Sequence, residues 1–217
     1  MEHFDFDRQI DKLDQNDLLY LTIKRFSEID LHPERVSNIE MGYVFEELIR
    51  RFNEYAEAGD HYTPREVIRL MTHLLFLHDD ASILTKPGLT QTLYDCAAGT
   101  GGMGSVAQEY LLNQNPTAHL EFFGQEINPE SYAICKADLL IKGEDARNIR
   151  LGNTLSNDLF PHDTFDYLIS NPPYGVDWKS YEKAIKNEHE HENKVLMVVS
   201  DLVRLVQVTG SYYFSCT

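Results

Sequence analysis

An Asn-Pro-Pro-Tyr segment, Asn171 to Tyr174, is the most specific arrangement of chemical groups in this sequence. It follows directly on an apolar run, 165–170, that predicts a buried strand. Pro172 and Pro173 have fixed φ angles and no N–H donors, so the carbonyls beside them are rigid and free to accept hydrogen bonds. The side chain of Asn171 adds an amide oxygen, and the ring of Tyr174 offers a face on which a planar base could stack. The segment therefore predicts a cradle of acceptors for a planar amino group or amide.

A glycine-rich segment, Asp95-Cys96-Ala97-Ala98-Gly99-Thr100-Gly101-Gly102, lies upstream and follows another apolar run. Its glycines allow a sharp turn and a close approach of a ligand to backbone amides, and a helix N-terminus adds positive potential. The Lys-Ser/Thr pair of a phosphate loop is missing, so the segment alone fits either a nucleotide-like ligand or a structural turn. Glu126, at the end of the next predicted strand, can accept hydrogen bonds from both hydroxyls of a ribose. Together the two features predict a ligand with a free ribose.

Alternating strands and helices must position these groups. We expect strands at 91–95, 120–127, 149–153 and 165–170, with helices through 106–112 and from Asn128-Pro129 onward. Strands and helices that alternate with short loops are typical of a parallel sheet covered by helices, with ligands at the carboxyl ends of the strands. The predicted fold class is therefore α/β with a mainly parallel sheet.

A helical N-terminal domain is expected before this core, over residues 1–59. Apolar residues recur at helical spacing from residue 11 to about residue 55, and His32-Pro33 interrupts the pattern once. Thr63-Pro64-Arg65-Glu66 then combines a hydroxyl N-cap, a proline at the first helical position and a glutamate three residues after the cap. These signals predict a helix start, and His61-Tyr62 before it leave a binding role open.

Composition excludes several classes of protein. No stretch approaches the roughly 20 apolar residues of a membrane span, and residues 1–7 lack the pattern of a secretory signal. We therefore expect a soluble cytoplasmic protein with Cys96, Cys135 and Cys216 as free thiols. The 35 acidic and 19 basic side chains give a net charge of -16, so binding to DNA would require a partner. His189 and His191 are expected on a solvated surface, and no metal site is predicted.

The glycine-rich segment, Glu126 and the Asn-Pro-Pro-Tyr segment, in this order, resemble S-adenosylmethionine-dependent amino-methyltransferases. Segments 38–48, 60–66 and 152–155 narrow the resemblance to the modification (M) subunit of type I restriction-modification systems. The resemblance spans most of residues 1–193. It implies a Rossmann-like methyltransferase core over 60–193, incomplete in this chain, and transfer of a methyl group from S-adenosylmethionine to adenine N6 in DNA.

The resemblance also implies roles for individual residues. The cofactor-binding residues would be Asp60, His61, Tyr62, Thr63, Pro64, Arg65, Asp95, Gly99, Thr100, Gly101, Gly102, Glu126 and Asn153. Asn171, Pro172, Pro173 and Tyr174 would form the catalytic segment that holds the target base. Implied partners are DNA, held through a specificity subunit, and a second M subunit, with no membrane; the presence of a restriction subunit stays open. Cys96 stands where the family usually has proline, and Gly104 where it usually has a larger apolar residue, so we expect a looser glycine loop.

Two alternatives stay open. An Asn-Pro-Pro-Tyr cradle also fits a glutamine side-chain amide or an RNA base. The chain could also be a non-catalytic remnant that binds cofactor or assembly partners, because only four predicted core strands precede Asn171 whereas the family implies further strands beyond it. Residues 194–217 stop resembling the family, and translation restarted on the third base of the Lys194 codon permits a family-like sequence. We therefore predict an aberrant, frameshifted tail over 194–217 and no activity for this chain alone.

Overall fold

The computed structural model describes residues 6–32, 34–37, 40–42, 44–45, 47–48, 51, 63–77, 84–172 and 178–183. Several predictions lie outside these residues: Asp60, His61 and Tyr62, Pro173 and Tyr174, the polar run 188–193, and the tail 194–217 with Cys216. Among the helices that are described, none is long and apolar enough to cross a membrane.

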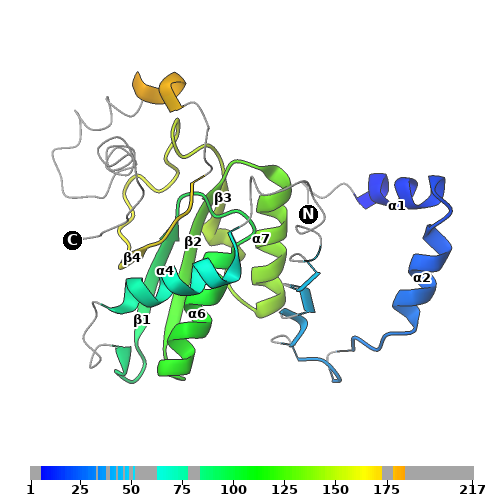
Figure 1. Cartoon of the computed structure of the whole chain (residues 1–217), viewed down its shortest axis with the longest axis horizontal. Helices are drawn as coiled ribbons and strands as arrows, with labels where there is room; N and C mark the ends of the chain where they lie inside the picture. The colour runs from blue at the N-terminus through cyan, green and yellow to red at the C-terminus, as the bar shows by residue number, and fades with distance from the viewer. Residues whose placement is uncertain are drawn as a thin grey trace.

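A parallel sheet lies at the centre of the described fold (Figure 1). Its strands are β1 (Thr90–Asp95), β2 (His119–Glu126), β3 (Ile149–Leu151) and β4 (Tyr167–Leu168), in the spatial order β3-β2-β1-β4. β1 pairs with β2 over its whole length, from Thr90 opposite His119 to Asp95 opposite Gly124. The predicted α/β class with a parallel sheet is confirmed, and the carboxyl ends of β1, β2 and β4 lie side by side.

The two outer strands are shorter than predicted. Before β4, the Asp166 carboxylate accepts hydrogen bonds from the backbone N–H of Thr92 (2.8 Å) and from its hydroxyl (2.9 Å), which takes the place of backbone pairing. After β4, the N–H of Ile169 donates to the carbonyl of Tyr94 (3.0 Å), so the chain stays beside β1. β3 ends where a turn begins at Asn153, whose carbonyl accepts from two amides further along the chain.

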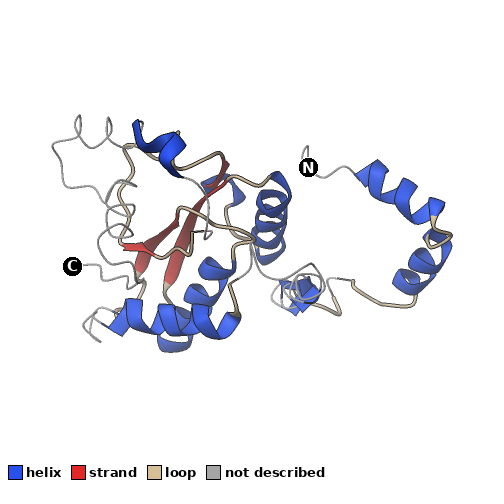
Figure 2. Cartoon of the chain, turned by 45° about the horizontal axis from the view of Figure 1, so that its top comes forward, coloured by secondary structure: helices blue, strands red, loops and turns tan. Residues whose placement is uncertain are grey.

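Helices connect the strands and pack around the sheet (Figure 2). α6 (Gly102–Gln114) joins β1 to β2, and α7 (Pro129–Lys142) with the short η1 (Ala146–Asn148) joins β2 to β3. α4 (Arg65–Leu77) packs on α6, and η2 (Trp178–Tyr181) follows the sheet. The main core lies between the sheet and α4, α6 and α7, and a smaller cluster forms around Tyr94, Cys96 and Phe160. The most deeply buried apolar residues of the main core are Leu93, Ala107, Leu111, Leu120, Cys135 and Ile149.

Gly104 in α6 is tightly packed. A Cβ at this position would lie 2.5 Å from the ring of Phe122 in β2. The Phe122 side chain is itself buried, so it fills the space that a larger residue at position 104 would occupy. The prediction that Gly104 loosens the glycine loop is therefore wrong.

The described part of the N-terminal region is largely helical, as predicted. α1 (Phe6–Gln15) and α2 (Leu19–Ser27) lie away from the sheet in Figure 1, and α2 has no buried residue. The predicted break at His32-Pro33 is confirmed, because the described residues between 28 and 37 are not helical. The chain also turns once earlier, between α1 and α2, where Asp17 has a φ of 57°. Asp is a poor helix former that tolerates this left-handed conformation. The described positions between 40 and 51 are helical, and a Cβ on Gly42 would lie 3.0 Å from the Lys142 stem in α7.

Candidate functional site

The glycine-rich segment forms the turn between β1 and α6. Gly99 (φ 55°) and Gly101 (φ 87°) adopt the left-handed conformation that favours glycine. A Cβ on Gly101 would also lie 2.8 Å from the Sγ of Cys135 in α7. Gly101 is the N-cap residue of α6, and no side chain caps this helix. The first turn of α6 therefore presents backbone N–H groups to whatever lies at the end of the sheet.

Glu126, at the end of β2, contacts this turn directly. Its Oε2 accepts a hydrogen bond from the backbone N–H of Gly99 (2.7 Å), and its Oε1 accepts from that of Asn128 (2.7 Å). The two amides hold the nearly buried carboxylate in one orientation. Each oxygen retains a second lone pair for a further donor. The two features that the sequence predicted to act together are thus in contact.

A buried polar network joins the ends of β1 and β4. The Ser170 hydroxyl donates to Oδ1 of Asp95 (2.7 Å), which also accepts from the N–H of Ala97 (3.0 Å). Asp95 and Ser170 are each 1% exposed, and the Oδ2 of Asp95 has no hydrogen-bond partner within the described structure. Burial raises the pKa of Asp95 to about 7, although the hydrogen bonds from Ser170 and Ala97 oppose this. Asp95 therefore carries an unsatisfied buried acceptor at the base of the glycine turn.

Cys96 belongs to the same network. Its Sγ donates to the Oγ of Ser170 (3.3 Å), and its carbonyl accepts from the Thr154 hydroxyl (2.6 Å). Burial raises the pKa of Cys96 to about 12, so the group stays a thiol. Cys96 and Cys135 are free cysteines, as predicted. These contacts link the turn to the ends of its neighbouring segments, and the looser loop expected at Cys96 stays a prediction.

Asn171 contacts the segment that precedes α4. Its Nδ2 donates to the Oγ1 of Thr63 (2.9 Å) across 108 positions of the sequence. The Pro64 carbonyl accepts from the N–H of Ile68 (3.0 Å) and so begins the hydrogen bonding of α4. Pro64 therefore occupies the N-cap position, and the prediction that Thr63 caps the helix is wrong. The Thr63 hydroxyl accepts from Asn171 instead.

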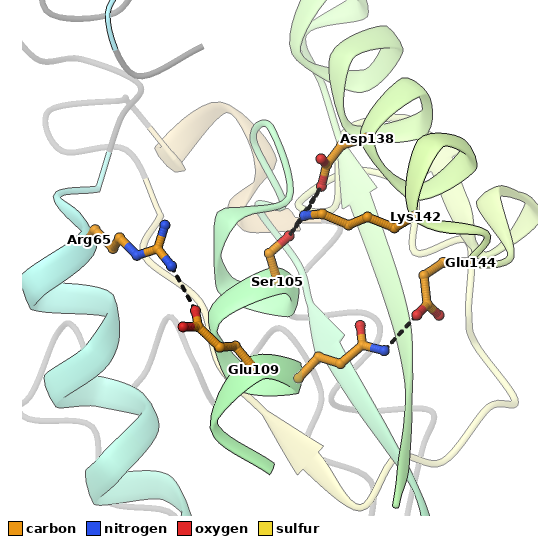
Figure 3. A network of polar contacts seen from close by, with 7 residues as sticks. Arg65, Ser105, Glu109, Asp138, Lys142 and Glu144 are labelled. Atoms are coloured by element: carbon orange, nitrogen blue, oxygen red, sulfur yellow. Dashed lines mark hydrogen bonds and ion pairs between the residues drawn. The ribbon is translucent and has the colours of Figure 1, made fainter. Parts of the chain in front are cut away.

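Ion pairs fasten the helices that carry these groups (Figure 3). In α4, Nη2 of Arg65 lies 2.6 Å from Oε2 of Glu109 in α6. In α7, Nζ of Lys142 lies 2.6 Å from Oδ2 of Asp138 and donates to the hydroxyl of Ser105 in α6 (2.7 Å). Arg65 thus directs its guanidinium toward α6, and its predicted role toward a cofactor stays a prediction. The start of α4, which follows Thr63, is thereby fixed relative to the glycine turn.

The loop after β3 lies against the same end of the sheet. Oδ1 of Asn153 accepts from the N–H of Leu155 (2.9 Å), so this side chain stabilises its own turn. Gln125, which is fully buried, donates to the carbonyl of Asn157 (2.8 Å) and accepts from the N–H of Leu159 (3.1 Å). The side chain of Gln125 therefore holds this loop beside Glu126.

Sequence reasoning missed Gln125 and Ser170. Each is a polar residue at the end of an apolar run, and each directly precedes a predicted site residue, Glu126 or Asn171. Their place at the end of a predicted strand, next to a predicted site residue, could have identified them. Of the described residues of the predicted site, Arg65 is directed toward Glu109 in α6. The others gather at one end of the sheet, namely Thr63, Pro64, Asp95, Gly99, Thr100, Gly101, Gly102, Glu126, Asn153, Asn171 and Pro172. Their roles toward ligands stay predictions.

The strand order and the groups at the carboxyl ends of the strands define a Rossmann-like α/β fold of the S-adenosylmethionine-dependent methyltransferase type. The chain belongs to the N-6 DNA methylase family, whose model matches residues 37–201.

Individual relatives agree with this assignment. The chain is 32% identical over 165 residues to the type I restriction enzyme MjaIX methylase subunit of Methanocaldococcus jannaschii, covering 75% of this chain and 27% of that protein. It is 28% identical over 167 residues to the type I restriction enzyme EcoEI methylase subunit of Escherichia coli, which covers 73% of this chain and 32% of that protein. A solved structure of the type I restriction-modification system methyltransferase subunit from Streptococcus thermophilus is similar, with a TM-score of 0.57 and 31% identity. The match covers 75% of this chain and 33% of that one. The chain thus spans a third or less of the length of these relatives.

Proposed function

We propose that this chain is part of a type I modification subunit that transfers a methyl group from S-adenosylmethionine to adenine N6 in DNA. The observation that carries the proposal is the adjacency of two sites. The glycine turn contacts Glu126 (2.7 Å), and the neighbouring strand β4 leads directly to Asn171. The groups proposed to hold a nucleoside and those proposed to accept from an amino group are thus at neighbouring strand ends, which supports group transfer between two bound molecules.

The residues present fit S-adenosylmethionine. Glu126 has lone pairs left for two ribose hydroxyls, and the uncapped start of α6 offers backbone donors. The unpartnered Oδ2 of Asp95 can accept from a cationic or N–H group beside the turn. When bound, the cofactor supplies an electrophilic methyl group on a sulfonium.

Asn171 and Pro172 would activate the target amino group. The lone pair of adenine N6 is delocalised into the ring, so N6 attacks only when its pyramidal form is favoured. Hydrogen bonds from its two protons to Oδ1 of Asn171 and to the Pro172 carbonyl favour that form and direct the lone pair. No general base is required beforehand, because the proton becomes acidic only as the bond to carbon forms. Positioning and electrostatics then supply the rate.

DNA would reach the site with the help of other subunits. The net charge of -16 opposes binding of a polyanion by this chain alone. We propose a specificity subunit and a second modification subunit as partners; the relatives are named as subunits of type I restriction enzymes, which supports assembly into a complex. The target base must leave the duplex at a cost of a few kcal/mol. Stacking on Tyr174, a sequence prediction, would offset part of that cost.

Replacing Asn171 with alanine tests the proposal. In the complete enzyme, Asn171→Ala should lower turnover on duplex DNA about a hundredfold or more, because it removes an acceptor aimed at developing charge. Calorimetry should show unchanged affinity for S-adenosylmethionine. Asn16→Ala, in an exposed turn, is the control and should retain activity. An active Asn171→Ala enzyme contradicts the proposal, and so does transfer to RNA or to a glutamine amide in place of duplex DNA.

A further inference from the structure

We propose that Thr63 is a positioning residue that fixes the side-chain amide of Asn171 with its Oδ1 available to the target amino group. This inference rests on the proposed function and deepens it. It assigns Thr63 a role toward the catalytic side chain that neither the sequence nor the family resemblance predicts.

The two ends of an amide are chemically opposite. Oδ1 of Asn171 can accept an amino proton of the target, whereas Nδ2 can only donate. A rotation of half a turn about the last side-chain bond would present N–H groups to an amino group and would prevent activation. In the structure Nδ2 is used by Thr63, at 2.9 Å from its Oγ1, so Oδ1 is left for another donor.

The proton of the Thr63 hydroxyl decides which orientation is stable. A hydroxyl has one donor and two acceptor sites, so it could bond to either end of the amide. Asn171 is its only hydrogen-bond partner among the residues that the structure describes. When the hydroxyl proton is donated to a ligand, only lone pairs remain for Asn171, and the amide must present Nδ2. Because Thr63 lies in the segment predicted to bind the cofactor, we expect cofactor binding to fix the amide in the productive orientation.

Both partners are attached to rigid elements. Thr63 lies two residues before Arg65, the first residue of α4, and α4 is tied to α6 by the Arg65–Glu109 ion pair (2.6 Å). Asn171 directly follows Ser170, whose buried hydroxyl bonds to Asp95 (2.7 Å). Neither side chain depends on a loop tip for its place, so loss of the contact should change orientation more than position.

Nuclear magnetic resonance of the chain labelled with ¹⁵N-asparagine tests the contact without any activity. The side-chain signal of Asn171 is assigned by its loss in Asn171→Ser. In the wild-type chain its amide protons should exchange slowly with water, and S-adenosylhomocysteine should slow the exchange further. Thr63→Val should raise the exchange rate about tenfold, because it removes the acceptor while keeping the shape. Thr63→Ser should retain slow exchange, and an unchanged rate in a folded Thr63→Val chain overturns the inference.

Kinetics of the complete enzyme distinguish positioning from cofactor binding. At saturating S-adenosylmethionine, Thr63→Val should lower kcat about tenfold or more, as loss of orientation does, and Thr63→Ser should restore most of it. A change in KM for the cofactor with kcat unchanged would overturn the positioning role while leaving the proposed function intact. In the Asn171→Ala background, Thr63→Val should cause no further loss of kcat. An additional loss there would overturn the inference too.

Discussion

The starts of α6 and α7 differ although both helices follow a neighbouring strand of the same sheet. α7 begins with Asn128, whose Oδ1 accepts from the N–H groups of Glu130 (2.8 Å) and Ser131 (3.1 Å), and Pro129 follows at the first helical position. α6 begins at Gly101 in the left-handed conformation without a side-chain cap. One helix satisfies its first amides with its own cap residue, whereas the other has no side-chain acceptor for them.

The presence or absence of a side-chain cap distinguishes a helix start that serves stability from one that is available to a ligand. A side-chain cap stabilises a helix by about 1 kcal/mol, and α6 forgoes it at a position where glycine adds an entropic cost. The carboxylate of Glu126 and the unpartnered Oδ2 of Asp95 belong to residues at the same end of the sheet, the carboxyl ends of β2 and β1. The local instability at α6 is therefore consistent with selection for a ligand rather than for stability.

Substitution of Gly101 should have the largest effect. Gly101→Ala combines a left-handed conformation, about 1 to 2 kcal/mol, with a clash against Cys135 Sγ, about 1 to 3 kcal/mol, since a Cβ there would lie 2.8 Å away. We expect a loss of about 2 to 5 kcal/mol in the free energy of unfolding, measured with urea. Gly143→Ala is the matched control, because Gly143 has a φ of 80° with nothing within 4 Å of the added Cβ. Equal losses in the two variants would contradict the packing argument.

Asp95 should make stability depend on pH. Its pKa is raised from 3.8 to about 7, so the folded chain holds a proton that the unfolded chain releases. Stability should therefore fall as the pH rises from about 4 to about 7, and Asp95→Asn should remove up to about 4 kcal/mol of this fall. Asp145 is the control with the opposite sign, because hydrogen bonds from Arg147 lower its pKa to about 2. The stability that Asp145 contributes is present above pH 4 and is lost only below it. If stability falls with pH between about 4 and 7 equally steeply in Asp95→Asn and in the wild type, Asp95 is not the group responsible.

Glu126 tests whether the uncapped start binds the cofactor. Glu126→Gln should weaken binding of S-adenosylmethionine by about 1 to 3 kcal/mol, the usual cost of losing charge-assisted hydrogen bonds. Glu130→Gln, in the exposed first turn of α7, should leave the affinity unchanged. Calorimetry on both chains measures the difference. Unchanged affinity in a folded Glu126→Gln chain would mean that the carboxylate serves only to hold the backbone of Gly99 and Asn128.

The smallest effect is expected at the capped start. Asn128→Ala should lower the free energy of unfolding by about 1 kcal/mol, because the amides of Glu130 and Ser131 lose their acceptor. Affinity for S-adenosylmethionine should not change, since the Asn128 backbone N–H that bonds to Glu126 remains. A loss of affinity comparable to that of Glu126→Gln would show that the two helix starts are not functionally distinct.

The sequence by itself determined the elements whose signals are local. Asn128-Pro129 predicted the start of α7, and alternating apolar runs predicted the parallel sheet, because capping and burial are encoded within a few residues. It also placed the glycine turn and Glu126 together, since the carboxyl ends of neighbouring parallel strands meet at one edge. The ends of β3 and β4 were overestimated, because side chains such as Asp166 replace backbone pairing there.

Only the tertiary structure decided the partners of groups that are distant in sequence. The sequence around Thr63 predicted a helix cap, yet the Thr63 hydroxyl accepts a hydrogen bond from Asn171, 108 positions away. Gly104 was expected to loosen the glycine loop, but the ring of Phe122 fills the space beside it. Ser170 can donate to Asp95 only because β4 lies beside β1. Hydrogen bonds and packing depend on which atoms the fold brings within a few ångströms, and that information is absent from spacing along the chain.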